Sequence, residues 1–252
     1  MHTRNLVRHG RTAVLACAAC AAAVGVAACG SSSSSSTTGA GGTSGAAFAP
    51  SDSQKKGGTL KVVSAEGFEH LDPGQAYFQI DYTVVYAAQR PLYSFKPTDA
   101  TNPEPDLADG PPKISSDGKT VTVKIKPNVK YSPPVNRAAT SADVKYAIER
   151  GFTPQVPNGY APAYFGSLVG AKAAASGGQI SGITTPDPTT IVFKLTKPFG
   201  GTFAQALTLP LTAPVPESYA KQFDKNNPST YDTKPTVQAF TGPYVIKSFS
   251  PS

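Results

Sequence analysis

The sequence predicts an α/β fold, because strand patterns and helix patterns follow one another along the chain. The clearest unit is residues 117–150, DGKTVTVKIKPNVKYSPPVNRAATSADVKYAIER, which is typical of a strand, a turn-rich connection and a helix. A second strand pattern occupies residues 189–197, and helical patterns occupy residues 81–89 and 203–209. The chain has 252 residues and is 39% hydrophobic, which suffices for one substantial domain or two small ones.

In the central unit, apolar and polar residues alternate over residues 120–125. This period of two is typical of a strand with one buried and one solvated face. Thr140 and Asp143 then have the spacing of a capping box, in which each residue's side chain can bond a backbone N–H of the other. The apolar residues that follow have helical spacing: Val144, Ala147 and Ile148.

Further elements are expected on both sides of this unit. Before it we expect a mostly buried strand at 59–64, a helix at 81–89 capped by Asp81, a short strand at 93–95, and a loop rich in Pro and Asp up to Gly118. After it we expect a strand at 189–197, helices at 203–209 and from Pro216 to Phe223, and a last strand at 244–246. If residues 161–168 form a helix, Tyr160 and Tyr164 could present their rings on one side.

Residues 1–28 have the order of a secretory signal peptide. Three arginines and two histidines precede the apolar run TAVLACAACAAAVGVAA, which is too short and too rich in alanine for a good membrane span of about 20 residues. The stretch Val26-Ala27-Ala28-Cys29 resembles the bacterial lipobox, which predicts cleavage before Cys29 and acylation of its thiol. An ordinary signal peptide that is cut elsewhere is the alternative.

Residues 29–56 are predicted to be a lipid-anchored Ser/Gly-rich linker. They contain six consecutive serines, and such a composition buries too little apolar surface to offset the entropy of ordering. Acyl chains on Cys29 would hold the protein on a membrane through about 0.8 kcal/mol per buried CH₂. Cys17 and Cys20 would leave with the signal peptide, so no disulfide is expected within the mature chain.

The formal charge of +7 raises the question of a nucleic-acid partner. Three of the basic residues are arginines of residues 1–28, and without them 20 basic residues face 16 acidic ones, a balance of about +4. The remaining lysines and arginines form no cluster with interleaved aromatic residues. We therefore expect no nucleic acid among the partners.

The central unit also carries a family resemblance. The positions that carry it are Lys126, Val129, Lys130, Tyr131, Thr140, Asp143, Val144, Tyr146, Ile148, Glu149 and Arg150. They resemble the signature region of the family 5 extracellular solute-binding proteins, the peptide- and nickel-type receptors of ABC importers. Further landmarks follow in that family's order: GGTL at 57–60, Leu71-Asp72-Pro73, Pro105-Asp106-Leu107-Ala108 and Thr241-Gly242-Pro243-Tyr244. The resemblance covers roughly residues 56 to 250.

This resemblance implies a periplasmic-binding-protein type II-like fold, of which the chain would hold the first lobe without the second. Residues 57–80 and 181–252 would then form an incomplete main domain, and residues 81–180 an inserted small domain. The connection AEGFEHLDP at residues 65–73 would form one wall of the ligand cleft. The candidate cleft residues are Glu66, Gly67, Phe68 and Glu69 in this wall, with Tyr160 and Tyr164 as stacking faces. The alternative for the two tyrosines is packing in the core.

The function implied by the resemblance is capture of a peptide or similar small solute by hinge closure, followed by delivery to ABC permease subunits. The receptor would be an exported monomer, lipid-anchored at the outer face of the cytoplasmic membrane, and would need no cofactor or metal. One alternative is a truncated surface lipoprotein or interaction module without transport activity. Another is an exported hydrolase, for which Glu66, Glu69, His70 and Asp72 could supply acid–base groups. Because the sequence has no nucleophile motif to accompany them, we do not expect an enzyme.

Overall fold

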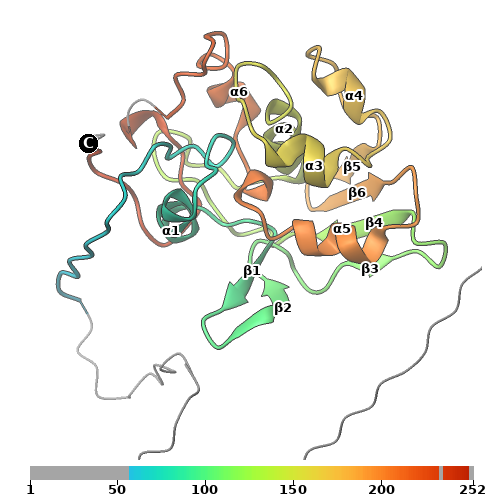
Figure 1. Cartoon of the computed structure of the whole chain (residues 1–252), viewed down its shortest axis with the longest axis horizontal. Coiled ribbons are helices and arrows are strands. Elements are labelled where there is room, and N and C mark those ends of the chain that lie inside the picture. The colour runs from blue at the N-terminus through green and yellow to red at the C-terminus, as the bar shows by residue number, and fades with distance from the viewer. Residues whose placement is uncertain (1–56, 233–234, 250–252) are drawn as a thin grey trace, which may run out of the picture. The chain divides into compact units, whose positions relative to one another are not determined.

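The computed structural model describes residues 57–232 and 235–249, so the predicted signal peptide, Cys29 and the linker lie outside the described residues. All elements belong to one compact unit, Ala46–Ser252. Its helices are α1 (Gln79–Ala88), α2 (Ser141–Arg150), α3 (Tyr160–Phe165), α4 (Ala171–Ala174), α5 (Gly200–Ala206) and α6 (Glu217–Ala220), with 3₁₀ turns at Pro210–Thr212 and Pro235–Val237. Its strands are β1 (Tyr93–Lys96), β2 (Asp99–Pro105), β3 (Lys113–Ile114), β4 (Thr120–Lys124), β5 (Ile183–Asp187) and β6 (Thr190–Lys194) (Figure 1).

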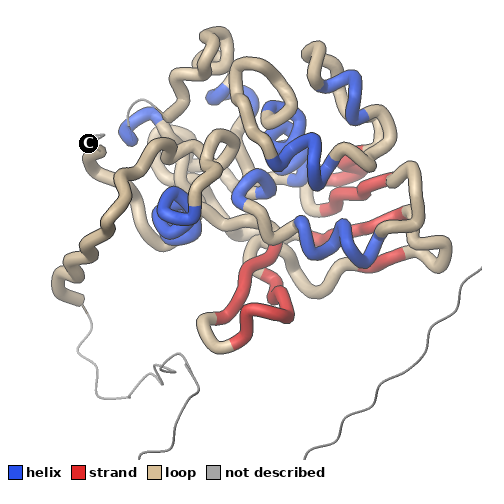
Figure 2. The backbone as a smooth tube through the Cα atoms, viewed as in Figure 1, coloured by secondary structure: helices blue, strands red, loops and turns tan. Residues whose placement is uncertain are grey.

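The four-stranded sheet has the order β3-β4-β6-β5, and every neighbouring pair in it is antiparallel. The two strands predicted most clearly, β4 and β6, are its central pair, with Val121 opposite Phe193 and Val123 opposite Ile191. These four side chains are fully buried, as the alternating pattern predicts. Strands β1 and β2 form a separate hairpin away from this sheet (Figure 2).

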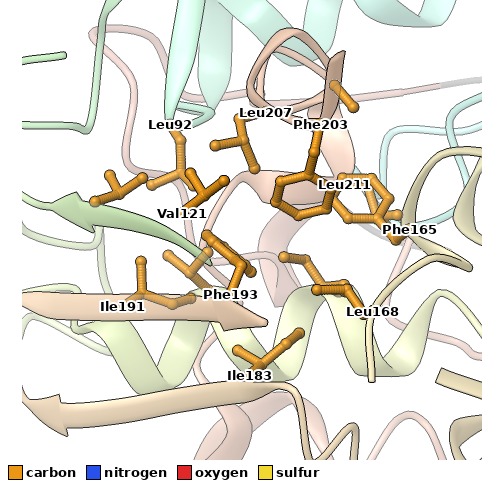
Figure 3. Packing of buried hydrophobic residues seen from close by; sticks show 14 of the residues in the cluster. Leu92, Val121, Phe165, Leu168, Ile183, Ile191, Phe193, Phe203, Leu207 and Leu211 are labelled. Carbon is orange, nitrogen blue, oxygen red and sulfur yellow. The ribbon is translucent and has the colours of Figure 1, made fainter. Parts of the chain in front are cut away.

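The main core lies between the inner face of the sheet and the helices that cover it. Figure 3 shows the side chains that meet there: Val121, Ile183, Ile191 and Phe193 from the sheet, Phe165 and Leu168 from α3 and the turn after it, Phe203 and Leu207 from α5 and its end, with Leu92 and Leu211. Val144 and Ile148 add the apolar face of α2 to the same cluster. The predicted helix face is therefore confirmed as a core-facing surface.

The predicted start of α2 is confirmed together with its capping box. The Asp143 carboxylate accepts the backbone N–H of Thr140 at 2.9 Å and the Thr140 hydroxyl at 3.0 Å. Arg137 donates two further hydrogen bonds of 2.7 Å to the same carboxylate. Local sequence therefore fixes this helix end, because its partners lie within six residues of one another.

The expected strand at residues 59–64 is wrong. This segment has no regular secondary structure and pairs with no strand among the described residues, and Leu60 and Val63 are 87% and 95% exposed. Residues 244–246 likewise form no strand; the N–H groups of Gly242 and Tyr244 bond to carbonyls at the end of α1. An apolar extended segment becomes a regular strand only where a neighbouring chain accepts its backbone hydrogen bonds.

The Pro- and Asp-rich stretch before Gly118, expected to be a loop, contains β2 and β3. Strand β2 tolerates Pro103 and Pro105 because it pairs on one side only, with β1. Strand β5 was also not predicted, and it completes the sheet beside β6. Each of these strands pairs with a strand next to it in the sequence, and it is this pairing, more than the strand's own apolar pattern, that makes it regular.

Helix boundaries differ from the expected ones. Helix α1 begins two residues before Asp81, which lies in the first turn and is fully buried instead of capping the helix. Helix α5 begins at Gly200, earlier than expected, and α6 ends at Ala220, before Phe223. The boundary between the inserted small domain (81–180) and the second part of the main domain (181–252) stays a prediction. The four-stranded sheet combines strands from both sides of this boundary. In the described part of the chain, no helix is long and apolar enough to cross a membrane.

Candidate functional site

Helix α1 presents two exposed flanks beside its buried side. Asp81, Val85 and Ala88 face the interior. Tyr82 and Tyr86 are four residues apart and share one flank, because a helix turns by about 100° per residue. The other flank borders residues 66–68 of the predicted cleft wall.

The tyrosine flank belongs to a group of rings that we call the aromatic cluster. Its members come from the loop before α1, from α1 and from α3: Tyr77, Phe78, Tyr82, Tyr86, Tyr160 and Tyr164. Tyr160 lies at its centre, stacked on Tyr77 with the ring centroids 4.6 Å apart and the planes at 15°. Tyr160 also meets Tyr164 and Tyr82 edge-on, at 5.7 and 6.5 Å. The two predicted stacking residues are thus joined by four others.

Several of these rings are open to solvent. Tyr77, Phe78 and Tyr164 are 44%, 46% and 49% exposed. The alternative of core packing is therefore wrong for Tyr164, whereas Tyr160 is half-buried between its neighbours. Single exposed apolar side chains are common on folded proteins, but a contiguous group of them marks an interaction surface. The aromatic cluster is accordingly the first candidate for a ligand-contacting surface.

Asn158 connects the two segments that carry the central rings. Its side-chain amide donates to the carbonyl of Gly74 at 2.7 Å, and its side-chain oxygen accepts the backbone N–H of Tyr160 at 2.9 Å. Asn158 itself is buried. Next to it, Gly159 leaves room for a ring, since a Cβ at this position would lie 3.1 Å from a ring carbon of Tyr77. Asn158 therefore fixes, from the buried side, the two segments that carry the stacked rings of Tyr77 and Tyr160.

Arg150 anchors the same loop from the interior. Its guanidinium, 2% exposed, donates to both carboxylate oxygens of Asp72 at 2.7 and 2.8 Å, and to Asp224 at 2.6 and 2.9 Å. Burial opposes ionisation of Asp224, but hydrogen bonds from Arg150, Ser229 and Tyr146 outweigh it and lower the pKa of Asp224 below its ordinary value. A charged network of this kind fixes the position of the loop that leads to Tyr77.

The second flank of α1 borders a groove with a volume of about 430 Å³. It is lined by Glu66, Gly67 and Phe68 of the predicted wall, by Ile80, Thr83, Val84, Ala87 and Ala88 of α1, and by Val62, Ser64, Tyr244 and Ile246. Glu69 is exposed beyond this lining. The loop is held by Asp81, whose carboxylate accepts the backbone N–H groups of Glu69 and His70 at 2.9 and 3.3 Å.

The two groups of predicted site residues do not meet on one surface. Tyr160 and Tyr164 belong to the tyrosine flank of α1, whereas residues 66–68 lie against its other flank. Sequence reasoning missed Tyr77, Phe78, Tyr82 and Tyr86. The available signal was the density of aromatic residues between positions 77 and 86, but only the packing of α1 against α3 joins them to Tyr160.

Two of the four residues considered for acid–base chemistry, Asp72 and His70, already have structural partners. Asp72 is buried against Arg150, and His70 Nδ1 lies 2.8 Å from a carboxylate oxygen of Asp232. This hydrogen bond raises the pKa of His70 above its ordinary value of 6.5, although partial burial acts in the opposite direction. Glu66 and Glu69 are exposed to solvent. Asp72 and His70 therefore help to fix the position of the loop.

Comparison with known proteins identifies the family. Residues 102–252, more than half of the chain, match the model of the bacterial extracellular solute-binding proteins, family 5 Middle. The chain belongs to this family. The resemblance of the signature region is thereby confirmed. Comparison of this family 5 chain with curated protein sequences gives no match.

Solved structures support the same fold for this family 5 chain. The clavulanic acid biosynthesis oligopeptide binding protein 2 is 30% identical with a TM-score of 0.65, over 77% of this chain and 34% of its own length. The pheromone receptor PrgZ is 24% identical with a TM-score of 0.64, over 75% of this chain and 36% of its own length. Listeria monocytogenes OppA bound to peptide is 23% identical with a TM-score of 0.61, over 71% of this chain and 34% of its own length. The chain thus spans about a third of these relatives. This confirms the expected α/β fold as part of a periplasmic-binding-protein lobe.

Proposed function

We propose that this chain is part of an extracytoplasmic receptor that captures peptides or similar small solutes for an ABC importer. The observation that carries the proposal is the family match over residues 102–252. The names of the similar structures add support, since two of them are named as oligopeptide-binding proteins. Capture would be reversible and non-covalent, with hinge closure around the solute and delivery of the closed form to the permease.

In this proposal the aromatic cluster is one wall of the binding site. Four of its rings are exposed, those of Tyr77, Phe78, Tyr86 and Tyr164. The segments that carry Tyr77 and Tyr160 are fixed on their buried side by Asn158 and, through the Asp72 loop, by Arg150. A surface that is already ordered loses little conformational entropy when a solute binds to it. The residues predicted at 66–69 form a second surface across α1, and their part in binding is also a proposal.

Thermal unfolding of the complete chain with and without peptides tests the receptor function. A ligand that binds only the native state stabilises it, by about 2.7 kcal/mol when its concentration is 100 times the Kd. We expect a mixture of tri- to pentapeptides at millimolar concentration to raise the Tm, and the same mixture of free amino acids to leave it unchanged. A Tm that responds to neither mixture would contradict the proposed function.

We further propose that the receptor is monomeric and tethered by acylated Cys29 at the outer face of the cytoplasmic membrane. The basis is the lipobox and the polar linker after it, both of which precede the described residues. In cells fed a radiolabelled fatty acid, the wild type should be labelled and sediment with membranes. A Cys29→Ser variant should be unlabelled. Equal labelling of both proteins would exclude this anchor.

A further inference from the structure

The segments that form the aromatic cluster carry no exposed charged side chain. Between Pro73 and Gln89 the one charged residue is Asp81, and between Gly151 and Ala171 there is none. Asp81 is fully buried, and one of its carboxylate oxygens accepts two backbone N–H groups. These segments therefore offer no ionic partner to a solute.

We propose that the aromatic cluster selects solutes that carry an uncharged aromatic ring, such as a phenylalanine or tyrosine side chain of a peptide. This inference rests on the proposed receptor function and names the chemical class that this wall prefers. The interaction is stacking and edge contact between rings, which prefer centroid separations of about 4.5–7 Å. The cluster's own ring pairs already have this spacing, from 4.6 to 6.5 Å.

The geometry leaves room for another ring. Tyr77 and Tyr160 are nearly parallel, at 15°, and Tyr77, Phe78 and Tyr164 each keep close to half of their surface exposed. A ring from the solute extends this arrangement without displacing any of its members. A glutamate side chain would lose water there and find no opposite charge in either segment. A lysine ammonium would find no exposed opposite charge, and its attraction to ring faces is weaker at solvent-exposed rings than at desolvated ones.

Hydrogen bonds on the buried side of the cluster fix the positions of the rings, so that the surface selects solutes by shape. Asn158 fixes the start of α3 to the loop before α1, and that loop is tied to buried Arg150 through Asp72. Rings held in this way present a fixed shape, and fixed aromatic residues supply contact area at low entropic cost. A loosely held aromatic patch would accept apolar groups of any shape.

Isothermal titration of the complete chain with three tripeptides tests the proposal. The probes are Ala-Phe-Ala, Ala-Ala-Ala and Ala-Lys-Ala. We expect Ala-Phe-Ala to bind about 3- to 10-fold more tightly than Ala-Ala-Ala, the range of one aromatic pair. Ala-Lys-Ala should bind no more tightly than Ala-Ala-Ala. Equal binding of all three, or tightest binding of Ala-Lys-Ala, would overturn the preference while leaving the receptor function intact. Binding of none would overturn both.

A matched pair of variants locates the preference. Phe78 in the cluster and Phe95 on the β1–β2 hairpin are 46% and 42% exposed, so Phe78→Ala and Phe95→Ala remove equal side chains of similar exposure. Phe78→Ala should reduce the preference for Ala-Phe-Ala at least twofold, and Phe95→Ala should preserve it. Circular dichroism checks that both variants fold. An unchanged preference in folded Phe78→Ala would assign the selectivity to another surface.

Discussion

Arg150 and Asp72 are 78 residues apart in the sequence and form a buried ion pair, with Arg150 Nη1 at 2.7 and 2.8 Å from the two carboxylate oxygens. Each belongs to a different landmark of the family resemblance, Arg150 to the end of the signature helix and Asp72 to the Leu-Asp-Pro turn. The Asp72 backbone also begins the turn that leads to Tyr77, since its carbonyl accepts the N–H groups of Gln75 and Ala76. This pair therefore connects the sheet-packed helix α2 to the candidate site.

Arg150→Met should destabilise the chain strongly. It leaves Asp72, which is fully buried, without its positive partner, and breaking a buried pair in this way costs about 3–5 kcal/mol. Urea denaturation measures the loss as a fall in the midpoint concentration. Lys221→Met is the control, because Lys221 and Glu217 form an exposed pair whose removal should cost at most about 1 kcal/mol.

Adding Asp72→Asn to Arg150→Met should restore part of the lost stability. The second change removes the uncompensated negative charge and keeps the shape of the side chain. If the double variant is less stable than Arg150→Met, the cost arises from lost packing, and the electrostatic explanation is wrong.

His70 should titrate with a raised pKa because of Asp232. His70 is the one histidine outside residues 1–28, so its imidazole proton signal in a nuclear magnetic resonance titration is unambiguous for residues 57–252. We expect its pKa to lie above 6.5, since the Asp232 hydrogen bond, together with the charges of Asp232, Asp81 and Asp72, favours the protonated ring. Asp232→Asn should lower this pKa. A value below 6.5 in the wild type would contradict the ion pair.

The same pair makes part of the stability depend on pH. Because the folded pKa of His70 is raised above the unfolded value, its contribution is fully present below about pH 6.5 and is lost as the pH rises through the folded pKa. The stability difference between wild type and His70→Gln should therefore be larger at pH 6 than at pH 9. Denaturant unfolding at both pH values measures it. An equal difference at both would exclude a contribution from protonated His70.

Gly159→Ala should disturb the aromatic cluster. The backbone φ of Gly159 is −64°, which alanine adopts freely, so the effect comes from the new Cβ pressing on the Tyr77 ring. We expect weaker near-ultraviolet circular dichroism from the tyrosines and a loss of about 1 kcal/mol from the displaced stack. An unchanged tyrosine spectrum would show that the ring accommodates the methyl group without moving.

Gly201→Ala is the matched control for the previous variant. Gly201 lies in α5, and a Cβ there would meet no atom within 4 Å. Alanine should therefore stabilise the chain by about 0.5–1 kcal/mol, because it lowers the entropy cost of forming the helix. Its tyrosine spectrum should match that of the wild type.

Thr140→Ala should weaken the start of α2. It removes half of the capping box and the 3.0 Å hydrogen bond from the Thr140 hydroxyl to Asp143. The expected cost is about 1 kcal/mol by denaturant unfolding. Because Arg137 still pairs with Asp143, the helix should keep its position. If Thr140→Ala lost as much stability as Arg150→Met, Thr140 would stabilise more of the fold than the start of α2.

Local patterns predicted the elements whose signals are complete within a short stretch. The capping box of Thr140 and Asp143 needs only three residues of spacing, and the alternation in β4 needs only one buried face. Residues 59–64 have an equally apolar pattern but no pairing partner among the described residues, so the strand expected there does not form. Strands β2, β3 and β5 were missed for the converse reason. Their own sequences lack an alternating apolar pattern, but a neighbouring strand pairs with their backbone.

The sequence by itself determined the family, the central strands and the capped helix α2. It also placed Tyr160 and Tyr164 one helical turn apart. Tertiary structure alone decided that Tyr77 stacks on Tyr160, that residues 66–68 face the other flank of α1, and that Asp72 meets Arg150. These contacts join segments separated by tens of residues, and their geometry depends on how the whole core packs. A pattern within one segment contains no information about which distant segment it will meet.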